Sequence, residues 1–261
     1  MKKYFVVGNK SSQSLSPMIF NYWFKKYKIK AEYRYLELNN KNFSKEIHKT
    51  LTNNETGGLN ITIPFKKKII KHIDRLDTHS KKINAVNCVS KKTKIIGANT
   101  DWQGYLNTLP KINKNFKQKN ILIIGYGGAG IAIHYGLISS GFENIFVINR
   151  SKKKLNFKKK ACFTESFKKI DYYLKNVDVI INTTPTNPII ESKKNLVNKK
   201  TLLSDIVYKP KETNFLKSFP KNKKIYGISM LIHQAVLSFE IWFGFKPKLD
   251  KELMRMLNKQ I

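Results

Sequence analysis

A buried strand that leads into a glycine-rich loop is the feature that most restricts how this 261-residue chain can fold. The apolar run Ile121–Ile124 is followed by G-Y-G-G-A-G and then by an apolar segment that ends near Ser140. Glycine permits a tight turn between strand and helix, and the first amides of the helix can approach an anion. Further strands are predicted at Ile145–Ile148, 177–182 and 202–207. This alternation predicts a Rossmann-type unit with a parallel sheet.

The spacing of the glycine loop, G-x-G-G-x-G, departs from the dinucleotide-binding pattern G-x-G-x-x-G. Two interpretations therefore stay open on the loop alone. In the first, the pyrophosphate of a dinucleotide lies against the loop backbone, where the helix dipole favours anions. In the second, the loop is only a tight turn between a strand and a helix. The residues that would hold the pyrophosphate are Gly125, Tyr126, Gly127, Gly128 and Ala129.

The next strand ends in a basic loop rather than in an acidic residue. An Asp or Glu at this point would bind the ribose 2′-hydroxyl of NAD. This loop instead offers a guanidinium, a hydroxyl and three ammonium groups, which suit a 2′-phosphate, and only four of the 50 basic residues are arginines. The loop therefore favours NADP over NAD, with a merely solvated basic loop as the alternative. Its residues are Asn149, Arg150, Ser151, Lys152, Lys153 and Lys154.

The first hundred residues also alternate short strands and helices, so the chain is assigned to the α/β class. The helix that starts near Ser16 is predicted to have this serine as its N-cap and Pro17 as its first residue. After Gly227 the chain is predicted to be mainly helical. Strands are predicted at 3–7, 33–38, 58–63, 85–90 and 95–98, and a further helix at 42–51.

Hydroxyl and charged side chains follow several of these predicted strands. Ser14 and Ser16 stand at a helix N-terminus and can bind a carboxylate, although N-capping alone also explains Ser16. Lys66 follows one strand and Asp101 another, and a lysine and an aspartate that meet can exchange a proton with a substrate. The alternative for Lys66 is a solvated surface lysine, because lysine is so abundant in this chain.

The formal net charge of +33 has two explanations. Dense positive charge attracts a polyanion such as nucleic acid. However, proteins that grip phosphates favour arginine, and here the lysines run along the whole chain. Lysine, isoleucine and asparagine are all abundant and share A/T-rich codons, so we attribute the charge to genome composition rather than to a nucleic-acid partner.

The remaining composition argues against metal and membrane chemistry. Cys88 and Cys162 lack metal-binding or redox spacing and are predicted to be buried free thiols. The five histidines are scattered, so no metal site is predicted. No apolar stretch is long enough to span a membrane, and the apolar run after the N-terminal lysines is too short for a signal peptide. We therefore predict a cytoplasmic protein.

Nine short segments, read in order, cover the chain from Gly8 to about Gly244. They are G-N-x-x-x-x-S-L-S-P at 8–17, G-L-N-I-T-I-P-F-K at 58–66, A-V-N-C at 85–88, G-A-N-T-D at 97–101, G-Y-G-G-A at 125–129, N-R-S at 149–151, I-N-T-T-P at 181–185, D-I-V-Y-K-P at 205–210 and M-L-I-H-Q-A at 230–235. Each segment is modestly specific, whereas nine in this order are strongly specific. In this combination the sequence resembles the shikimate dehydrogenase family.

The resemblance implies two α/β domains with a cleft between them. The substrate domain would comprise residues 1–101 and 235–261, with C-terminal helices that return to it, and the Rossmann-type NADP-binding domain residues 102–234. The implied reaction is the NADPH-dependent, reversible reduction of 3-dehydroshikimate to shikimate in aromatic amino-acid biosynthesis. The implied partners are small molecules rather than a membrane or nucleic acid, and a homodimer is one candidate assembly.

The resemblance also implies roles for single residues. Lys66 would be the catalytic acid and base, with Asp101 as its partner. The shikimate carboxylate would bind Ser14 and Ser16. The substrate hydroxyls would be lined by Thr62, Asn87, Asp101, Tyr208 and Gln234. NADP would place its pyrophosphate on residues 125–129, its adenosine phosphate on residues 149–154 and its nicotinamide end against Ile206 and Gly227.

Several positions depart from the family pattern. Trp102 and Ser229 stand where the family usually has glycine, and so does Asn84. Cys88 replaces the usual threonine, and T-P-T-N at 184–187 lacks the usual Gly-Met. None of these removes a proposed catalytic group, so they bear on rate and substrate preference rather than on reaction type. Two alternatives stay open: an enzyme that accepts quinate or NAD, and a basic nucleic-acid-binding protein that keeps the fold.

Overall fold

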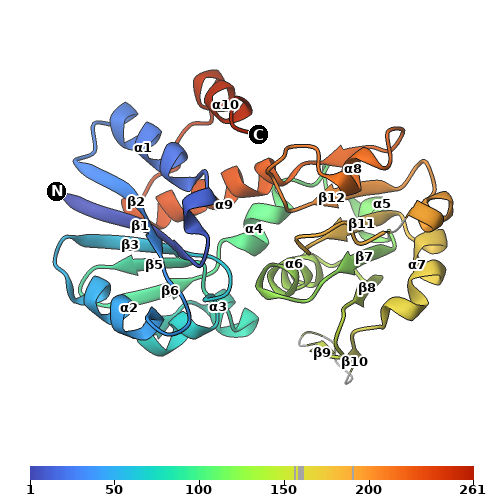
Figure 1. Ribbon diagram of the computed structural model, residues 1–261, viewed down its shortest axis with the longest axis horizontal. Helices are drawn as coiled ribbons and strands as arrows, with labels where there is room; N and C mark the ends of the chain where they lie inside the picture. Colours follow the sequence, from blue (N-terminus) through green and yellow to red (C-terminus); the bar gives the residue numbers. More distant parts are fainter. Residues whose placement is uncertain (156, 158–161, 190) are drawn as a thin grey trace. The chain divides into compact units, whose positions relative to one another are not determined.

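The computed structural model describes residues 1–155, 157, 162–189 and 191–261 (Figure 1). These residues divide into two compact units. Unit 1 consists of Met1–Asp101 and Gln234–Gln260, and unit 2 of Trp102–His233 together with Ile261. Both units combine a sheet with helices, which confirms the predicted α/β class.

A six-stranded sheet forms the centre of unit 1, in the order β2-β1-β3-β5-β6-β4. Its strands are β1 (Lys2–Gly8), β2 (Ala31–Glu37), β3 (Thr56–Ile61), β4 (Arg75–Leu76), β5 (Cys88–Lys91) and β6 (Ile95–Ala98). β1 pairs in parallel with β2 and β3, whereas β5 is antiparallel to β3 and β6. A Cβ atom at Gly58 would lie 2.5 Å from Trp242 Nε1, so glycine is what lets β3 approach this indole.

Helices bury apolar side chains against this sheet. In α1 (Ser16–Lys26) the buried stripe includes Phe20, Trp23 and Phe24, and α2 (Phe43–Thr52) buries Ile47 and Leu51. Both stripes repeat every three or four residues, as expected of helices with one covered face. The other helical segments of unit 1 are η1 (Ser11–Gln13), η2 (Lys68–His72), α3 (Thr78–Ile83), α10 (Lys251–Asn258) and the second part of α9 (Gly227–Phe243).

The prediction that Ser16 is the N-cap of α1 is wrong. The helix begins at Ser16 itself, and Leu15 occupies the capping position without a side-chain hydrogen bond. Ser14 replaces the expected cap, because its Oγ accepts a hydrogen bond of 3.2 Å from the Ser16 amide. Both hydroxyls lie at this helix start, where the sequence analysis placed them.

The C-terminal helices return to unit 1, as predicted. Trp242 of α9 donates a hydrogen bond of 3.0 Å to the Val89 carbonyl, and its ring centroid lies 4.7 Å from that of Tyr4. Helix α10 begins after its N-cap Asp250, whose carboxylate also accepts a hydrogen bond of 2.8 Å from the Tyr22 hydroxyl on α1. These contacts fasten the C-terminal helices to β1, β5 and α1.

Unit 2 is built on a five-stranded parallel sheet in the order β13-β12-β11-β7-β8, which confirms the Rossmann-type prediction. The strands are β7 (Ile121–Ile124), β8 (Ile145–Ile148), β11 (Val179–Asn182), β12 (Leu202–Asp205) and β13 (Lys224–Ile225), and β9 (Lys154–Leu155) pairs separately with β10 (Cys162–Phe163). The helices are α4 (Asp101–Leu106), α5 (Lys114–Lys117), α6 (Gly128–Ser139), α7 (Ile170–Asn176), α8 (Asn214–Lys217), η3 (Phe167–Lys169), η4 (Glu191–Leu196) and the first part of α9. Every residue of β7 is apolar and buried, as in a central parallel strand.

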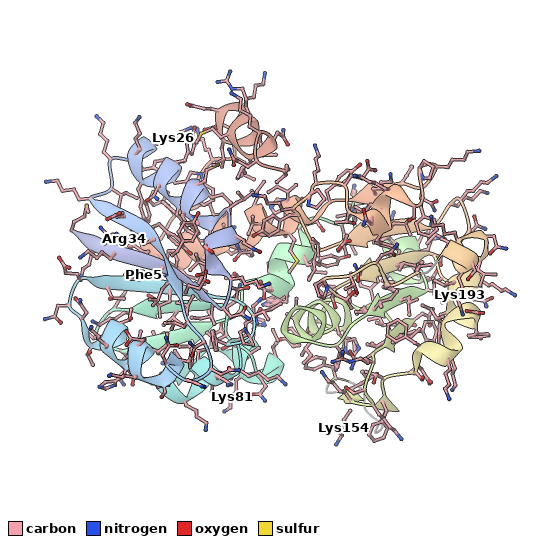
Figure 2. The ribbon with its side chains drawn as sticks, viewed as in Figure 1. Phe5, Lys26, Arg34, Lys81, Lys154 and Lys193 are labelled. Atoms are coloured by element: carbon pink, nitrogen blue, oxygen red, sulfur yellow. The ribbon has the colours of Figure 1, made fainter. Side chains whose placement is uncertain are left out.

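Lysines lie on many different elements. Lys26 belongs to α1, Lys81 to α3, Lys154 to β9 and Lys193 to η4, and all four are marked in Figure 2. Positive charge spread in this way differs from the single basic face that is typical of a nucleic-acid-binding domain. Among the described helices, none is both long enough and apolar enough to cross a membrane.

Candidate active site

The carboxyl edge of the sheet in unit 1 gathers the first group of candidate residues. The strand registers place Val7 opposite Ile61, Asn60 opposite Cys88, and Cys88 opposite Ala98. The ends of β1, β3 and β6 and the start of β5 therefore meet at one edge. In open α/β sheets, ligands bind beyond this edge, where the segments that follow the strands carry their side chains.

Two of the strands are shorter at this edge than predicted, because β3 ends early and β5 begins late. Strand β3 ends at Ile61, and the chain turns so that the Phe65 amide donates to the Thr62 carbonyl at 2.9 Å. Strand β5 begins only at Cys88, because the preceding backbone bonds elsewhere: the Val86 amide donates to the Lys66 carbonyl at 2.8 Å. In a continuous strand these side chains would point to the two faces of the sheet. The irregular backbone at both places brings them to the edge of the sheet instead.

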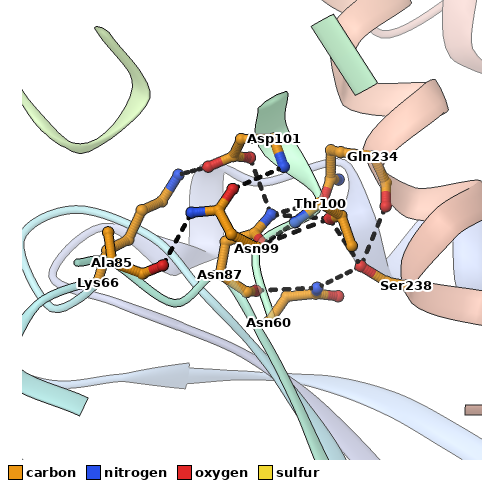
Figure 3. Close-up of polar contacts among 9 residues, drawn as sticks. All are labelled: Asn60, Lys66, Ala85, Asn87, Asn99, Thr100, Asp101, Gln234 and Ser238. Atoms are coloured by element: carbon orange, nitrogen blue, oxygen red, sulfur yellow. Dashed lines mark hydrogen bonds and ion pairs between the residues drawn. The ribbon is translucent and has the colours of Figure 1, made fainter. Parts of the chain in front are cut away.

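Lys66 and Asp101 form an ion pair at this edge (Figure 3). Lys66 Nζ lies 2.5 Å from Asp101 Oδ2, and the two side chains are 13% and 6% exposed. The neighbouring Phe65 is fully buried and stacks on Phe43 with 4.2 Å between ring centroids, which anchors the turn that carries Lys66. A mostly buried ammonium held by a carboxylate is suited to give a proton to a bound carbonyl oxygen.

Asn87 fixes the other side of the Asp101 carboxylate. Its Nδ2 donates to Asp101 Oδ1 at 2.8 Å, and its Oδ1 accepts from the Thr100 amide at 2.6 Å. The Asp101 amide in turn donates to Asn99 Oδ1 at 3.1 Å. Both oxygens of Asp101 are therefore bonded, so the carboxylate cannot turn away from Lys66 without losing a second hydrogen bond.

Helix α9 adds two side chains to this network, and one of them was missed by the sequence analysis. Gln234 Oε1 lies 3.4 Å from Asn87 Nδ2. The missed residue is Ser238, whose Oγ accepts from Asn60 Nδ2 at 2.9 Å and lies 3.3 Å from Thr100 Oγ1 (Figure 3). Ser238 stands four residues after Gln234, and that spacing puts both on the same side of a helix. This is the signal from which it could have been found.

Ser14, Ser16 and Thr62 lie on the segments that follow β1 and β3. Ser14 Oγ donates to Ser16 Oγ at 3.1 Å, which makes the two hydroxyls a joined pair. Thr62 is half-buried, and its methyl carbon would lie 2.4 Å from a Cβ atom at Gly8, so glycine at this position makes room for the threonine. The structure joins the other candidate residues of this edge in a chain of contacts, in which Lys66 contacts Asp101, Asp101 contacts Asn87 and Asn87 contacts Gln234. The serine pair lies beyond the neighbouring strand.

The structure explains one departure from the expected pattern, at Asn84, and shows the surroundings of a second, Cys88. Asn84 ends α3 with a left-handed backbone, φ 56°, a conformation that asparagine adopts more readily than other residues with a Cβ atom. It can therefore stand where the family usually has glycine. Cys88 is a fully buried free thiol, as predicted, and its burial raises its pKa to about 12. The side chain of Cys162 lies outside the described part of the chain.

In unit 2, two glycines of the loop are required by the fold and one is not. Gly125 has φ 98°, and a Cβ atom at Gly130 would lie 2.4 Å from the Gly125 carbonyl oxygen. At Gly127, which is the N-cap of α6, a Cβ atom would meet no atom within 4 Å. The fold leaves open space beside Gly127, at a helix N-terminus whose amides favour an anion.

The basic loop after β8 is hydrogen-bonded to the glycine loop. Asn149 Oδ1 accepts a hydrogen bond of 2.9 Å from the Tyr126 amide, and Lys153 Nζ donates to the Tyr126 carbonyl at 3.1 Å. The Tyr126 ring is buried, and its hydroxyl lies 2.9 Å from His134 Nδ1. The Tyr126 amide, carbonyl and hydroxyl are thus all bonded within unit 2, which fixes the backbone of the glycine loop at this residue. The exposed members of the basic loop are Arg150, Ser151, Lys152, Lys153 and Lys154.

Ile206 and Gly227 are brought together at the far end of this sheet edge. A Cβ atom at Gly227 would lie 2.5 Å from the Ile206 carbonyl oxygen, so only glycine allows this approach. The sequence analysis assigned no role to Asp205, which is buried and accepts hydrogen bonds from the Val207 amide and from Thr213 Oγ1. Burial raises its pKa above the ordinary value for an aspartate. Tyr208 follows in the same segment and is half-buried.

Two further findings concern the surroundings of these residues. The ring of Trp102 packs edge-on against Tyr135, with 5.7 Å between ring centroids, so the bulky side chain is part of the packing of unit 2. Within the described ranges, no group of three or more His, Cys, Asp or Glu side chains could hold a metal ion.

Comparison with known proteins places these features in a family. Models described as shikimate dehydrogenase substrate binding domain, shikimate / quinate 5-dehydrogenase and shikimate 5′-dehydrogenase C-terminal domain match residues 6–89, 108–212 and 227–256. A protein of Pelagibacter ubique named Shikimate dehydrogenase (NADP(+)) is 37% identical, over 99% of this chain and 100% of its own length.

Solved structures agree with these matches. The shikimate dehydrogenase of Aquifex aeolicus has a TM-score of 0.86 at 30% identity and covers 98% of this chain and 97% of its own. A shikimate dehydrogenase in complex with NADP+ has a TM-score of 0.83 at 30% identity and covers 99% and 95%. Likeness in sequence and fold over nearly its whole length shows that this chain belongs to the shikimate dehydrogenase family.

Proposed function

We propose that this protein is an NADP-dependent shikimate dehydrogenase, which reversibly reduces 3-dehydroshikimate to shikimate in aromatic amino-acid biosynthesis. The observation that carries the proposal is the Lys66–Asp101 ion pair, 2.5 Å long and bonded to Asn87, at the carboxyl edge of a sheet in a member of this family. The relative from P. ubique, named Shikimate dehydrogenase (NADP(+)), supports both the reaction and the cofactor.

Lys66 is the proposed acid and base. NADPH, when bound, supplies the hydride that reduces the ketone carbon. Lys66 gives a proton from Nζ to the ketone oxygen, which becomes the hydroxyl of shikimate, and it takes this proton back in the oxidation. Asp101 orients the ammonium, and Asn87 holds the carboxylate in turn. Because the Lys66 side chain is 13% exposed, it can recover its proton from water after each turnover.

The other polar residues of unit 1 are proposed to orient the substrate. The Ser14–Ser16 hydroxyl pair binds the carboxylate of shikimate, since hydroxyls and helix-start amides are donors that suit an anion. Asn87 and Gln234 belong to the same network as Asp101, which supports a role for both at the substrate hydroxyls. The remaining proposed contacts to the hydroxyls come from Thr62 of unit 1 and from Tyr208, which belongs to unit 2.

The residues of unit 2 fit NADP. The open space beside Gly127 and the amides at the start of α6 suit the pyrophosphate, with residues 125–129 as its cradle. Arg150 is exposed shortly after β8, is followed in the chain by Ser151 and three lysines, and suits the 2′-phosphate. The nicotinamide end is assigned to Ile206 and Gly227. The adenosine phosphate is assigned to Asn149, Arg150, Ser151, Lys152, Lys153 and Lys154.

These assignments make unit 1 the substrate domain and unit 2 the NADP domain. The domain bounds expected from the resemblance, residues 1–101 and 235–261 for the first and 102–234 for the second, differ from the two units at Gln234, which belongs to unit 1, and at Ile261, which belongs to unit 2. A cytoplasmic site of action, where NADPH and the substrate are both available, belongs to the same proposal. A homodimer is a hypothesis that sedimentation of the purified protein would test.

The test is a spectrophotometric assay of the purified chain with shikimate and either NADP+ or NAD+. We expect reduced nicotinamide to form, with kcat/KM at least about tenfold higher for NADP+, because the charged 2′-phosphate contact is worth about 1.5–3 kcal/mol. Quinate in place of shikimate tests the broader substrate range. Salt-sensitive binding of DNA or RNA without any turnover would contradict the proposal and favour a nucleic-acid-binding protein.

A further inference from the structure

Two side chains of the edge strand β2 reach the segment that carries the Ser14–Ser16 pair. The Tyr35 hydroxyl donates a hydrogen bond of 3.2 Å to the Ser14 carbonyl. Glu37 Oε2 accepts two hydrogen bonds from Ser12, one of 3.2 Å from its amide and one of 2.7 Å from its hydroxyl. The segment 12–14 is therefore held at both ends, at Ser12 by Glu37 and at Ser14 by Tyr35.

Parallel pairing between β1 and β2 explains why these two side chains are in reach. The register places Val6 opposite Tyr35 and Gly8 opposite Glu37, so both strands finish at the same edge of the sheet. Tyr35 and Glu37 are two residues apart and thus lie on the same face of β2. The chain leaves β1 at Gly8 and turns through η1 over this face, which brings Ser12 and Ser14 next to them.

The bond from Tyr35 bears directly on the serine hydroxyls. It holds the Ser14 carbonyl, and therefore the peptide that joins Ser14 to Leu15. Ser14 Oγ meanwhile accepts from the Ser16 amide and donates to Ser16 Oγ. This peptide links Ser14 to the residues that follow, so its rotation shifts the Ser16 amide and hydroxyl away from Ser14 Oγ and breaks both contacts. The orientation of the hydroxyl pair thus depends on a side chain from the neighbouring strand.

Tyr35 itself contributes little to the core, because its side chain is 48% exposed. Its hydroxyl can therefore be removed without opening a cavity. Glu37 is also exposed, and its charge lies close to a site proposed to bind an anion. The amide and hydroxyl of Ser12, together with the nearby Lys10, lower the pKa of Glu37 below its ordinary value. The negative charge of Glu37 is therefore stabilised by these partners.

We propose that Tyr35 and Glu37 are positioning residues for the substrate, which hold the Ser14–Ser16 hydroxyl pair in the orientation that binds the substrate carboxylate. This inference rests on the proposed function. Neither residue touches the reacting atoms, so the loss of either weakens binding of substrate and transition state alike. Such a loss raises KM and leaves kcat unchanged.

The central test is Tyr35→Phe, which removes only the hydroxyl. We expect KM for shikimate to rise about 3- to 10-fold, as for the loss of one hydrogen bond, with kcat and KM for NADP+ within about twofold of the parent. Tyr172→Phe is the matched control: Tyr172 lies on α7 of unit 2, is 66% exposed and undergoes the same chemical change, so its KM for shikimate should stay unchanged. Ser12→Ala, which removes a donor to Glu37, should also raise KM for shikimate.

A substrate without the carboxylate charge tests whether the rise in KM comes from weaker binding of the carboxylate. With the methyl ester of shikimate, Tyr35→Phe should cause no further rise in KM, because the hydroxyl pair has no carboxylate to bind. An equal rise with the ester, or a rise in KM for NADP+ of the same size, would mean a general structural loss and would overturn the inference. Parent-like KM values in both Tyr35→Phe and Ser12→Ala would do so as well. A parent enzyme that fails to oxidise shikimate contradicts the proposed function instead.

Discussion

Replacing Lys66 with methionine separates the chemistry of the Lys66–Asp101 pair from its part in stability. Methionine keeps an unbranched side chain of similar length, so the packing around position 66 is largely preserved. The ammonium is lost, and with it the proposed proton donor. We expect kcat to fall by about 10²–10⁴, which is the usual contribution of a general acid. This corresponds to about 3–5 kcal/mol of activation free energy.

The cost in stability follows from the burial of Asp101. Its side chain is 6% exposed, and after the substitution Asn87 Nδ2 still donates to Oδ1 at 2.8 Å while Oδ2 loses the ammonium. The free energy of unfolding should fall by about 1.5–3 kcal/mol, the range for a hydrogen bond to a charged group. Asp101→Asn in the same chain removes the unpaired charge, so the double variant Lys66→Met/Asp101→Asn should regain most of this stability without regaining turnover.

Initial rates with shikimate and NADP+ measure the fall in kcat, and urea unfolding measures the fall in the free energy of unfolding. Turnover of Lys66→Met within about tenfold of the parent would place the proton donor elsewhere, since it is below the smallest loss expected for a general acid. If the double variant recovers both stability and turnover, the activity of the single variant was lost through structure, and the role of Lys66 as an acid is refuted.

Four further predictions test other parts of the molecule. Gly127→Ala should unfold at a thermal midpoint close to that of the parent and should raise KM for NADP+, because only a ligand would meet the new methyl group. Gly130→Ala should be clearly destabilised, because its methyl group clashes with the Gly125 carbonyl. Equal midpoints of the two variants in thermal melts would contradict this contrast. Arg150→Ala should raise KM for NADPH by about tenfold and hardly change KM for NADH, and equal losses in steady-state assays with both cofactors would exclude a phosphate contact. Asn84→Ala should lower the free energy of unfolding by about 1–2 kcal/mol through its left-handed backbone, and chemical denaturation should show Asn84→Gly to be far milder. The pKa of Asp250 is lowered to about 2, chiefly by the Leu253 amide, so its capping contribution to stability is complete above its ordinary pKa of 3.8 and is lost as the pH falls towards 2. Asp250→Ala should therefore lower the free energy of unfolding by about 1 kcal/mol at neutral pH and by progressively less at acidic pH. A difference in unfolding free energy between parent and variant that does not change with pH would rule this out.

Local patterns in the sequence were sufficient for the strands β7, β8, β11 and β12 of unit 2 and for helix α6, whereas β13 and α7 were not predicted. The apolar run of β7, the glycine loop and the helix that follows are adjacent in the chain, and each predicts its own structure through short-range sterics. The ordered motifs were also sufficient to identify the family and to single out Lys66 and Asp101. Local rules failed at the start of α1, where Ser16 was taken for the cap, because the helix begins one residue earlier and the Ser14 hydroxyl accepts from the Ser16 amide.

Which distant side chains meet was decided only by the fold. Ser238 bonds to Asn60 across 178 residues of sequence, and Tyr35 bonds to Ser14 only because β1 and β2 pair in parallel with a particular register. Short-range patterns predict strands and helices, since these depend on neighbours in the chain. Strand order and register instead come from the packing of the whole sheet, and a register shifted by one residue would turn Tyr35 and Glu37 to the opposite face.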